Sequence, residues 1–392
     1  MKTPTSFASV ALLALSLSAK GAEPPAFKWR SVEIDQIDIG YGLQLADVDG
    51  DGKTDIVLAD QKTVQWYHNP DWKKHVIARD LTVRDNVCVS ARDIDGDGKC
   101  EIAVGGQWNF PESIKDGAVN YLIPPADRTQ PWTPVKLYNE PSTHRMHWIK
   151  GPDGHFSLAV KPLRGKGTVD GEGPGLKILE YFPPADPKSE WKTGLIDGTL
   201  HMSHNFHPVN WDDDPEEELI AAAKEGVWHF DRKDGGWVSR QLTTDFAGEI
   251  RDGRLPGGRR FIATVEPMHG TKSAAYVQPA DDGPGKLWPQ GAVLIEGIKD
   301  GHAIAVADYL AIGSDQVMVG WRAMNPKDVP GEPGISLFTP LSEDGTRWRE
   351  TKISGPEIAV EDLKAADLNG DGKADLVAAA RQTKNLTILF AE

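Results

Sequence analysis

Seven tryptophans, each at the head of a short strand-like segment, constrain the fold of this chain more than any other feature. The segments cover residues 29–35, 72–78, 132–138, 191–197, 237–243, 288–295 and 348–354. Successive tryptophans lie 43 to 60 residues apart, a period typical of repeats that each form one four-stranded blade. Every segment after the first also follows a second strand-like run, such as VQWYHNP before Trp72. We therefore expect seven similar all-β repeats.

The two ends of the repeat array complement each other. The segment at 29–35 has no strand-like run before it, and the final run at 385–392 has no tryptophan segment after it. The N-terminal segment can therefore supply the missing outer strand of the last blade, and closure removes the exposed sheet edges that invite aggregation. The sequence predicts an all-β fold, a seven-bladed β-propeller of four-stranded blades closed by the N-terminal strand.

Residues 1–21 have the features of a signal peptide. A lysine precedes the apolar run at 7–19, and small residues at positions 19 and 21 suit cleavage by signal peptidase. The apolar run is too short to span a bilayer. These features predict an exported protein, periplasmic or extracellular, without a membrane span. The mature part, residues 22–392, is expected to form a single propeller domain.

Cysteine content and charge limit the partners. Cys88 lies in the predicted inner strand of the second blade, and Cys100 begins the next strand. Their expected separation along the hairpin exceeds the reach of a disulfide, so both are predicted to be packed thiols. The formal net charge of −15 argues against nucleic acid as a partner.

Three loops share an acidic pattern that suits calcium. They are DVDGDGKTD (47–55), DIDGDGKCE (93–101) and DLNGDGKAD (367–375), with a degenerate fourth copy at 210–218. Oxygen ligands at alternating positions resemble the first half of an EF-hand loop, although here a strand follows in place of a helix. The predicted calcium ligands are Asp47, Asp49, Asp51, Asp55, Asp93, Asp95, Asp97, Glu101, Asp367, Asn369, Asp371 and Asp375. Because each loop joins the first two strands of its own blade, we favour a structural hairpin staple over calcium-regulated adhesion.

The acidic loops also set a register for the inner strands that line the propeller axis. Six residues before the first position of these loops, or of the equivalent loop at 308, stand Tyr41, His204, His302 and Glu361. Aligning HFSLAV with KCEIAV places His144 near the same height. One propeller histidine is usually structural, but three at equivalent positions favour a site at the end of the channel opposite the acidic loops.

Loops between the second and third strands of each blade return to this same end. They carry further acids, bases and imidazoles, which together with the inner-strand residues form a funnel suited to binding and acid–base chemistry. Imidazoles at this density are typical of Zn²⁺ or another divalent transition metal. The ligands would come from different blades, so spacing alone does not define the set.

Two resemblances extend this interpretation. The acidic loops resemble the FG-GAP/VCBS repeats of exported propellers. The motifs that resemble the propeller domain of the aldos-2-ulose dehydratase family, in blade order, are IGYGL (39–43), HR (144–145), HxxH (201–204), ExxHG (266–270) and His302. That family has a seven-bladed propeller, dehydrates keto sugars such as 1,5-anhydrofructose, and carries a metal ion in the propeller site.

The resemblance implies a carbohydrate-active lyase, a metal-assisted dehydratase that eliminates water from a small keto sugar of the 1,5-anhydrofructose or aldos-2-ulose type. The predicted signal peptide makes it an exported one. Together with the register, it gives the following roles. The catalytic residues are Tyr41, His144, His204 and His302, and the substrate-binding residues are Arg145, Lys224, Trp321, Arg322, Glu361 and Arg381. The transition-metal ligands are drawn from His201, His204, Glu266 and His269.

Two other classes of protein stay open at this point. A polysaccharide lyase or glycoside hydrolase acting on uronate-containing oligosaccharides would use the arginines and Lys224 to hold a carboxylate. A non-catalytic sugar-binding or adhesion propeller would bind ligand without turnover, and its histidines need not hold a metal. The dehydratase predicts activity on small keto sugars, whereas the lyase predicts cleavage of oligouronides.

Overall fold

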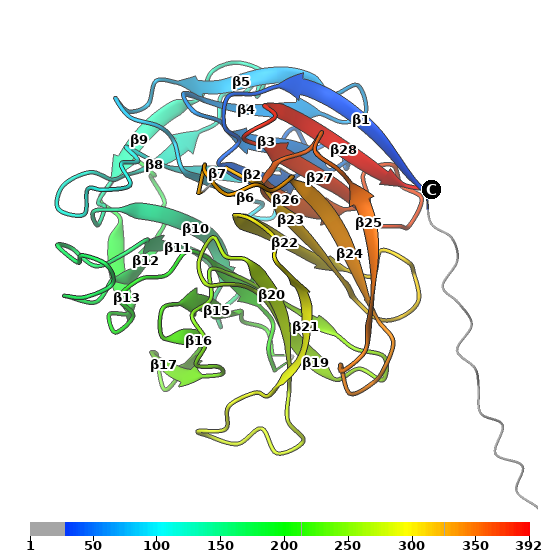
Figure 1. Ribbon diagram of the computed structural model, residues 1–392. Helices are drawn as coiled ribbons and strands as arrows, with labels where there is room; N and C mark the ends of the chain where they lie inside the picture. The colour runs from blue at the N-terminus through cyan, green and yellow to red at the C-terminus, as the bar shows by residue number, and fades with distance from the viewer. Residues whose placement is uncertain (1–27, 213, 325) are drawn as a thin grey trace, which may run out of the picture.

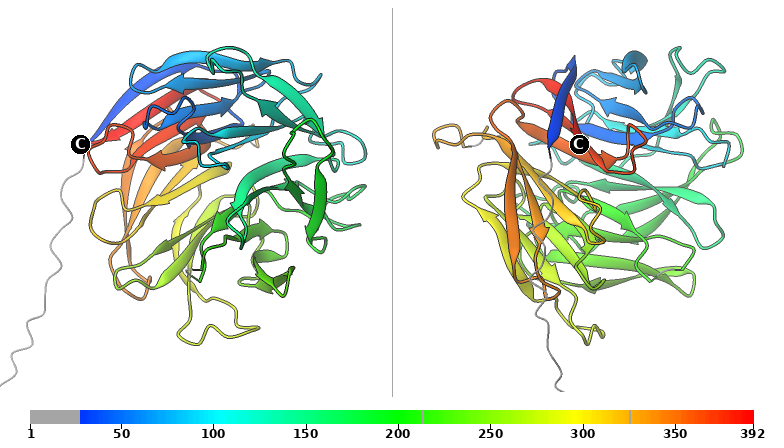
Figure 2. Two further views of the ribbon diagram at one scale, coloured as in Figure 1. Left: turned by 180° about the vertical axis from the view of Figure 1, so that it is seen from behind. Right: turned by 90° about the vertical axis from the view of Figure 1, so that its right-hand side faces the viewer.

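The computed structural model describes residues 28–392, except 213 and 325, and arranges them as seven four-stranded antiparallel sheets around a ring (Figures 1 and 2). The predicted seven-bladed β-propeller is confirmed. The predicted signal peptide, residues 1–21, lies outside the described residues. Within the described part of the chain, no helix has the length and hydropathy needed to cross a membrane.

Each blade consists of four strands that are consecutive in the chain, except in the last blade. Blades 1 to 3 contain β2 (Gly42–Ala46), β3 (Asp55–Ala59), β4 (Thr63–His68), β5 (Lys73–Arg79); β6 (Cys88–Arg92), β7 (Glu101–Gly106), β8 (Ala118–Ile123), β9 (Thr133–Leu137); β10 (Thr143–Lys150), β11 (Phe156–Pro162), β12 (Ile178–Phe182), β13 (Lys192–Asp197). Blades 4 to 6 contain β14 (Phe206–Val209), β15 (Glu218–Ala223), β16 (Gly226–Lys233), β17 (Gly236–Gln241); β18 (Glu249–Arg254), β19 (Arg260–Glu266), β20 (Lys272–Val277), β21 (Gln290–Glu296); β22 (Gly301–Ala307), β23 (Gln316–Trp321), β24 (Gly334–Pro340), β25 (Trp348–Ser354). Blade 7 contains β26 (Val360–Ala366), β27 (Asp375–Ala380), β28 (Asn385–Ala391) and β1 (Trp29–Gln36).

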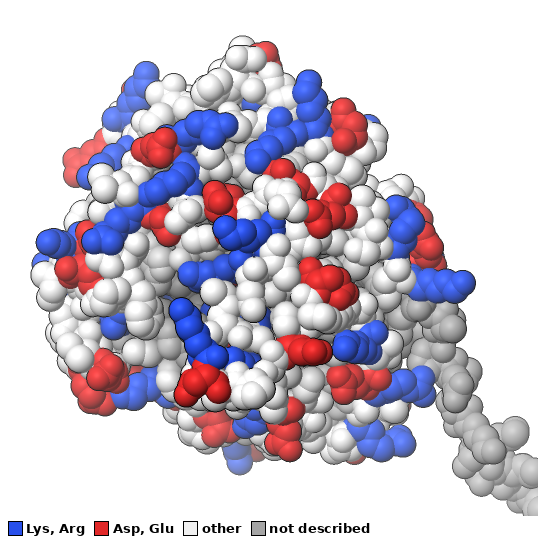
Figure 3. Space-filling view, turned by 45° about the horizontal axis from the view of Figure 1, so that its top comes forward, with Lys and Arg blue, Asp and Glu red and all other residues white. Residues whose placement is uncertain are grey.

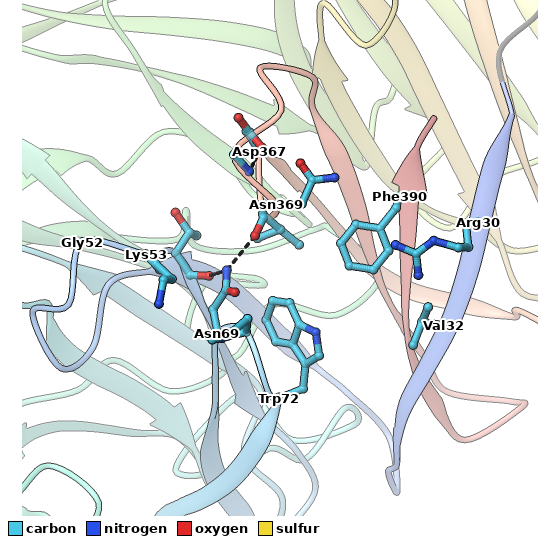
Figure 4. Close-up of a pocket in the computed structure, with 13 residues that line it drawn as sticks. Arg30, Val32, Gly52, Lys53, Asn69, Trp72, Asp367, Asn369 and Phe390 are labelled. Carbon is cyan, nitrogen blue, oxygen red and sulfur yellow. Dashed lines mark hydrogen bonds between the residues drawn. The ribbon is translucent and has the colours of Figure 1, made fainter.

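The N-terminal strand closes the ring, as predicted. Strand β1 pairs antiparallel with β28, from Trp29 opposite Ala391 to Gln36 opposite Asn385, and Figure 1 shows the blue and red strands side by side. At the seam between blades 7 and 1, Asn69 Nδ2 donates to the carbonyl of Leu368 at 2.8 Å (Figure 4). Closure therefore rests on a sheet ladder within blade 7 and on hydrogen bonds to blade 1.

The repeated tryptophans fill the seams between blades. The apolar core is divided into seven clusters, each formed by two neighbouring blades, and each of the seven tryptophans packs in a different cluster. These tryptophans are Trp29, Trp72, Trp132, Trp191, Trp237, Trp288 and Trp348. In every case the ring packs against the preceding blade. The seam explains the repeat, because a large aromatic side chain buries much apolar area where two sheets meet.

Both cysteines are free and buried, as expected from their predicted separation. Cys88 pairs with Gly105 at one end of the β6–β7 ladder, whereas Arg92 and Glu101, next to Cys100, pair at the other end. On the face shown in Figure 3, acidic and basic side chains are interspersed rather than gathered by sign.

The acidic loops join the first and second strands of blades 1, 2 and 7, as predicted. In the first loop, the carboxylate of Asp47 accepts hydrogen bonds from the N–H groups of Gly50 and Gly52 at 2.7 and 2.8 Å. The carboxylate of Asp55, at the start of β3, accepts from Val48 and Asn69 at 2.9 and 2.8 Å. The same pattern recurs in the loops that begin at Asp93 and Asp367. The acids therefore hold the hairpins in shape.

Candidate functional site

The predicted funnel is a cavity of about 250 Å³ at one mouth of the central channel. It is lined by Tyr41, Trp108, Phe110, His144, Arg145, His204, His269, His302, Arg322, Glu361 and Arg381. Most of these residues come from the starts of the inner strands, and the rest follow the second strand of a blade. The inner-strand register and the returning loops thus meet at this mouth, as the sequence indicates.

The inner-strand histidines each donate a hydrogen bond to the next blade. His144 Nδ1 lies 2.9 Å from the carbonyl of His204, and His302 Nδ1 lies 2.6 Å from the carbonyl of Glu361. His204 Nδ1 lies 2.7 Å from a carboxylate oxygen of Glu249. Because a carbonyl oxygen can only accept, Nδ1 carries the proton in His144 and His302. The lone pair of each neutral ring is then on Nε2.

Three imidazoles converge in the cavity. One nitrogen from each of His204, His269 and His302 lies within 4.8 Å of the other two, and the Nε2 atoms of His204 and His269 are 2.8 Å apart. With its proton on Nδ1, His204 accepts at Nε2 the hydrogen bond that His269 donates. The carboxylate of Glu361 approaches the same space, with Oε1 3.7 Å from His302 Nε2.

The turn between β19 and β20 directs His269 into the cavity. Residues 266–270 form a tight turn in which Met268 has a positive φ of 42°. A Cβ atom at Gly270 would lie 1.8 Å from the carbonyl oxygen of Glu266, so only glycine fits this position. The N–H of Gly301 then donates to the carbonyl of Gly270 at 2.9 Å, which joins the turn to the start of β22.

A buried arginine backs the imidazoles. Arg322 donates two hydrogen bonds of 3.0 Å to the carboxylate of Asp300 and a third to Glu361. Its NH2 also lies 3.4 Å from His269 Nδ1. This guanidinium is therefore paired on two sides with carboxylates, and it fixes the positions of Glu361 and His269 more than it offers charge to a ligand.

Tyr41 and two arginines complete the wall. Burial raises the pKa of the Tyr41 phenol, and the guanidinium of Arg381 lies 5.1 Å from the centre of its ring. Arg145 NH1 lies 3.2 Å from His144 Nε2 and 3.0 Å from the carbonyl of His144. A protonated phenol thus stands beside cationic donors.

The four histidines of the cavity are neutral bases. Burial, aided by the nearby positive charge of Arg145, holds the pKa of His144 and His204 well below the usual range. Burial likewise lowers the pKa of His269 and His302, with His204 next in importance for the first and Arg322 for the second. At neutral pH each uncharged ring keeps one lone pair that can take up a proton or coordinate a metal ion in place of its present hydrogen bond.

Comparison with known proteins supports the repeats and the resemblance to a dehydratase. A family model described as an FG-GAP-like repeat matches residues 47–104, which include the first two acidic loops. Aldos-2-ulose dehydratase of Phanerodontia chrysosporium is 23% identical to this chain over 377 residues, covering 85% of the chain and 39% of the relative. The resemblance predicted from the sequence is confirmed. The chain spans about two fifths of the length of this relative.

Solved structures of very different sequence share the fold. A chain from the crystal structure of the mitotic checkpoint complex has a TM-score of 0.58 at 14% identity, covering 97% of this chain and 99% of that one. The β-propeller domain of Myceliophteria thermophila Cps50 (Swd1) has a TM-score of 0.56 at 10% identity, covering 92% and 99%. At such low identities the likeness shows the propeller alone.

Four residues predicted for the funnel lie elsewhere. His201 Nδ1 pairs with Glu225 at 2.7 Å and lies outside the cavity, because residues three apart on an extended chain point to opposite sides. Lys224 forms an ion pair of 2.6 Å with Glu172 in a neighbouring loop. The ring of Trp321 packs between blades 5 and 6.

Glu266 is the fourth of these residues. Its Oε1 accepts from Thr264 and from the Tyr276 hydroxyl at 2.7 and 2.8 Å, and its Oε2 pairs with Lys272 at 2.7 Å. The carboxylate therefore anchors the turn behind His269. The three nitrogens that do converge come from His204, His269 and His302, so the predicted metal set loses His201 and Glu266 and gains His302.

The sequence interpretation missed two aromatic residues and one acid that matter to the site, and it gave a second acid no role. Trp108 and Phe110 lie on the loop after β7, and the Trp108 ring lies 4.8 Å from that of His144. An irregular loop has no periodic sequence pattern. The two aromatic residues that follow Gly105, Gly106 and Gln107 were the one indication that this loop lines the cavity. Asp300 pairs with Arg322 behind the cavity wall. Glu249, the ionisable residue nearest the register position in blade 5, pairs with His204.

Carboxylates also gather in the acidic loops. Oxygen atoms of Asp47, Asp49 and Asp55, and of Asp93, Asp95 and Glu101, lie within 4.8 Å of one another. Burial raises the pKa of Asp55 and Glu101 to about 7. A cation at these loops would offset the cost of ionising the two buried acids. Asp367, Asn369, Asp371 and Asp375 repeat the positions of the first loop in blade 7.

Proposed function

We propose that this protein is an exported, metal-assisted carbohydrate lyase that eliminates water from a small keto sugar. The observation that carries the proposal is the convergence of His204, His269 and His302, whose ring nitrogens lie within 4.8 Å of one another in a cavity that also holds a neutral base and a phenol. The relative that covers most of the chain is named a dehydratase. The cavity of about 250 Å³ suits a ligand the size of a monosaccharide.

The donor set fits a divalent transition metal. Neutral imidazoles are the usual nitrogen ligands of such ions. His204 and His302 present Nε2 because Nδ1 is tied to Glu249 and to a backbone carbonyl, an arrangement typical of metal-ligating histidines. When bound, the ion would polarise a substrate carbonyl as a Lewis acid.

The remaining groups suit the proton transfers of an elimination. His144 would take the proton from the carbon next to the ketone. The electron pair of the broken C–H bond then delocalises onto the ketone oxygen and forms the enediolate. Arg145 and Arg381 stabilise the negative charge that develops on oxygen. Tyr41 would protonate the departing β-hydroxyl as the C–O bond breaks, releasing water and leaving a carbon–carbon double bond. The phenolate then recovers the proton held by His144, so no organic cofactor is consumed.

A lyase acting on uronate-containing glycans is the second candidate, and one observation favours it. Arg145 donates to carbonyls and to His144 but, among the described residues, pairs with no carboxylate. A guanidinium that has no carboxylate partner within the protein can pair with the carboxylate of a uronate. Arg322, by contrast, already pairs with the carboxylate of Glu361.

Elemental analysis and an ultraviolet assay for unsaturated products test these proposals together. We expect one bound divalent transition metal and turnover of 1,5-anhydrofructose, with no cleavage of oligouronides. His204→Ala should lose the metal and reduce turnover by about 10²–10⁴-fold. His229→Ala is the control, because His229 lies on β16 and stacks on Trp211 away from the cavity. If His204→Ala and His269→Ala keep the turnover and metal content of the unmodified protein, the cavity is a binding site without catalysis.

A further inference from the structure

A second, much smaller void lies deeper in the channel, next to the funnel cavity. The two share Tyr41 and Arg145 as lining residues. The void measures about 20 Å³, which is room for a single particle of about the size of a water molecule. Its walls come from the inner strands of six blades, or from residues directly before those strands, so it lies on the propeller axis.

Positive charge dominates the lining of this void. Arg145, Arg251 and Lys364 face it, together with one carboxylate, that of Asp362. Both oxygens of Asp362 already have partners. Oδ1 lies 2.6 Å from Lys364 Nζ, and Oδ2 accepts from the N–H of Leu43 at 3.1 Å. The two guanidinium charges are left without an opposite charge in the void.

The arginines find no carboxylate partner elsewhere. Arg251 is 8% exposed, and its NH1 donates to the carbonyl of Ile250. Apart from residues 213 and 325, no carboxylate among residues 28–392 lies within 4.0 Å of either guanidinium. Glu249 is the next acid, but its two oxygens already accept from His204 and Asn205 at 2.7 and 2.6 Å.

Neighbouring imidazoles do not change this balance. Burial, together with the charge of Arg251, holds the pKa of His147 well below its usual range, so this lining residue is neutral. Counting Glu249, three cations face two carboxylates around the channel centre. Burying a charge without a counter-charge costs several kcal/mol, and an anion in the void would offset that cost.

We propose that the void binds one monatomic anion of the chloride class, held by Arg145, Arg251 and Lys364. Its volume excludes a phosphate, a sulfate or a substrate carboxylate with its carbon attached. The anion would also hold Arg145 beside His144, where NH1 lies 3.2 Å from Nε2. The proposal does not rest on the reaction proposed for the funnel cavity, although the two sites share Arg145.

Thermal unfolding tests the proposal. The protein is transferred to a chloride-free gluconate buffer, and chloride then replaces gluconate at constant ionic strength. We expect a saturable rise in melting temperature of about 1–3 °C, reproduced by bromide. Arg251→Gln should abolish the rise. Arg232→Gln removes an arginine that pairs with Glu180 away from the channel, and should lower the melting temperature but keep the rise. Equal melting in chloride and gluconate, or equal responses of the two variants, would overturn the proposal.

Bromide-soaked crystals of the unmodified protein give a test that needs no variant. An anomalous scattering peak among Arg145, Arg251 and Lys364 is the expected result. A water molecule there at saturating bromide, or bromide bound only at the surface, refutes the site.

Discussion

Glu249 Oε1 lies 2.7 Å from His204 Nδ1, and both side chains are almost fully buried, at 3% and 2% exposure. His204 is the cavity histidine that a carboxylate backs at hydrogen-bond distance, whereas His144 and His302 donate to carbonyls. The carboxylate crosses from blade 5 to blade 4, and its other oxygen accepts from Asn205 at 2.6 Å. Glu249 thereby fixes both the tautomer and the direction of the His204 ring.

Glu249→Gln should therefore weaken metal binding and turnover on a keto sugar by about 10–100-fold, with a shift in the pH profile. An amide can present its N–H₂ to His204 and force the opposite tautomer. Metal titration and the pH dependence of turnover are the measurements. Glu225→Gln is the matched control, because Glu225 forms the same 2.7 Å contact with His201 outside the cavity. Equal effects of the two substitutions would contradict a positioning role.

Acid should destabilise the protein as the pH falls below 6.5. Burial holds the pKa of His147 and His207 well below the usual 6.5, as it does for the cavity histidines. The unfolded chain then binds more protons than the folded one in this range, so stability is present above pH 6.5 and is lost as the pH falls.

Calorimetry between pH 8 and pH 5 measures this loss. His147→Gln removes one such group and should flatten the dependence by about one proton. His155→Gln changes an exposed histidine and should leave the slope intact. The same slope in both variants would show that buried neutral histidines are not its cause.

Chelation should lower the melting temperature of calcium-loaded protein while leaving ligand binding at the funnel cavity intact. Asp49→Ala and Asp95→Ala should act in the same direction, since each removes an oxygen ligand from a hard-cation site. Asp344→Ala is the comparison: Asp344 accepts from Thr346 in an exposed turn, so its effect should be equal with and without calcium. Unchanged melting in chelator would refute calcium binding by these loops.

A chain that begins at Ile37 should be less stable as a whole ring, rather than frayed at one end. Removing β1 exposes the full edge of β28 and takes Trp29 from the cluster between blades 6 and 7. Differential scanning calorimetry should show a single transition at much lower temperature. If the melting temperature stays within one or two degrees of that of the longer chain, β1 is not needed for closure.

Much of this architecture was predictable because it repeats. The tryptophans recur since every seam between blades is alike, and the acidic loops gave a register that placed Tyr41, His144, His204 and His302 at one height. What did not repeat was not predictable. Trp108 lies on a loop whose course depends on local turns, and the outward position of Lys224 depends on Glu172 in another blade.

The histidine hydrogen bonds that run from one blade to the next tie the chemistry to the circumference of the ring. His144, His204 and His302 each reach an acceptor on the following blade at 2.6 to 2.9 Å. Adding or deleting a single blade would change the angle between neighbours and move every such acceptor, even if the sheet closed again. Blade number is therefore as much a requirement of the site as any one of its side chains, and the cavity can be inherited only as a complete ring.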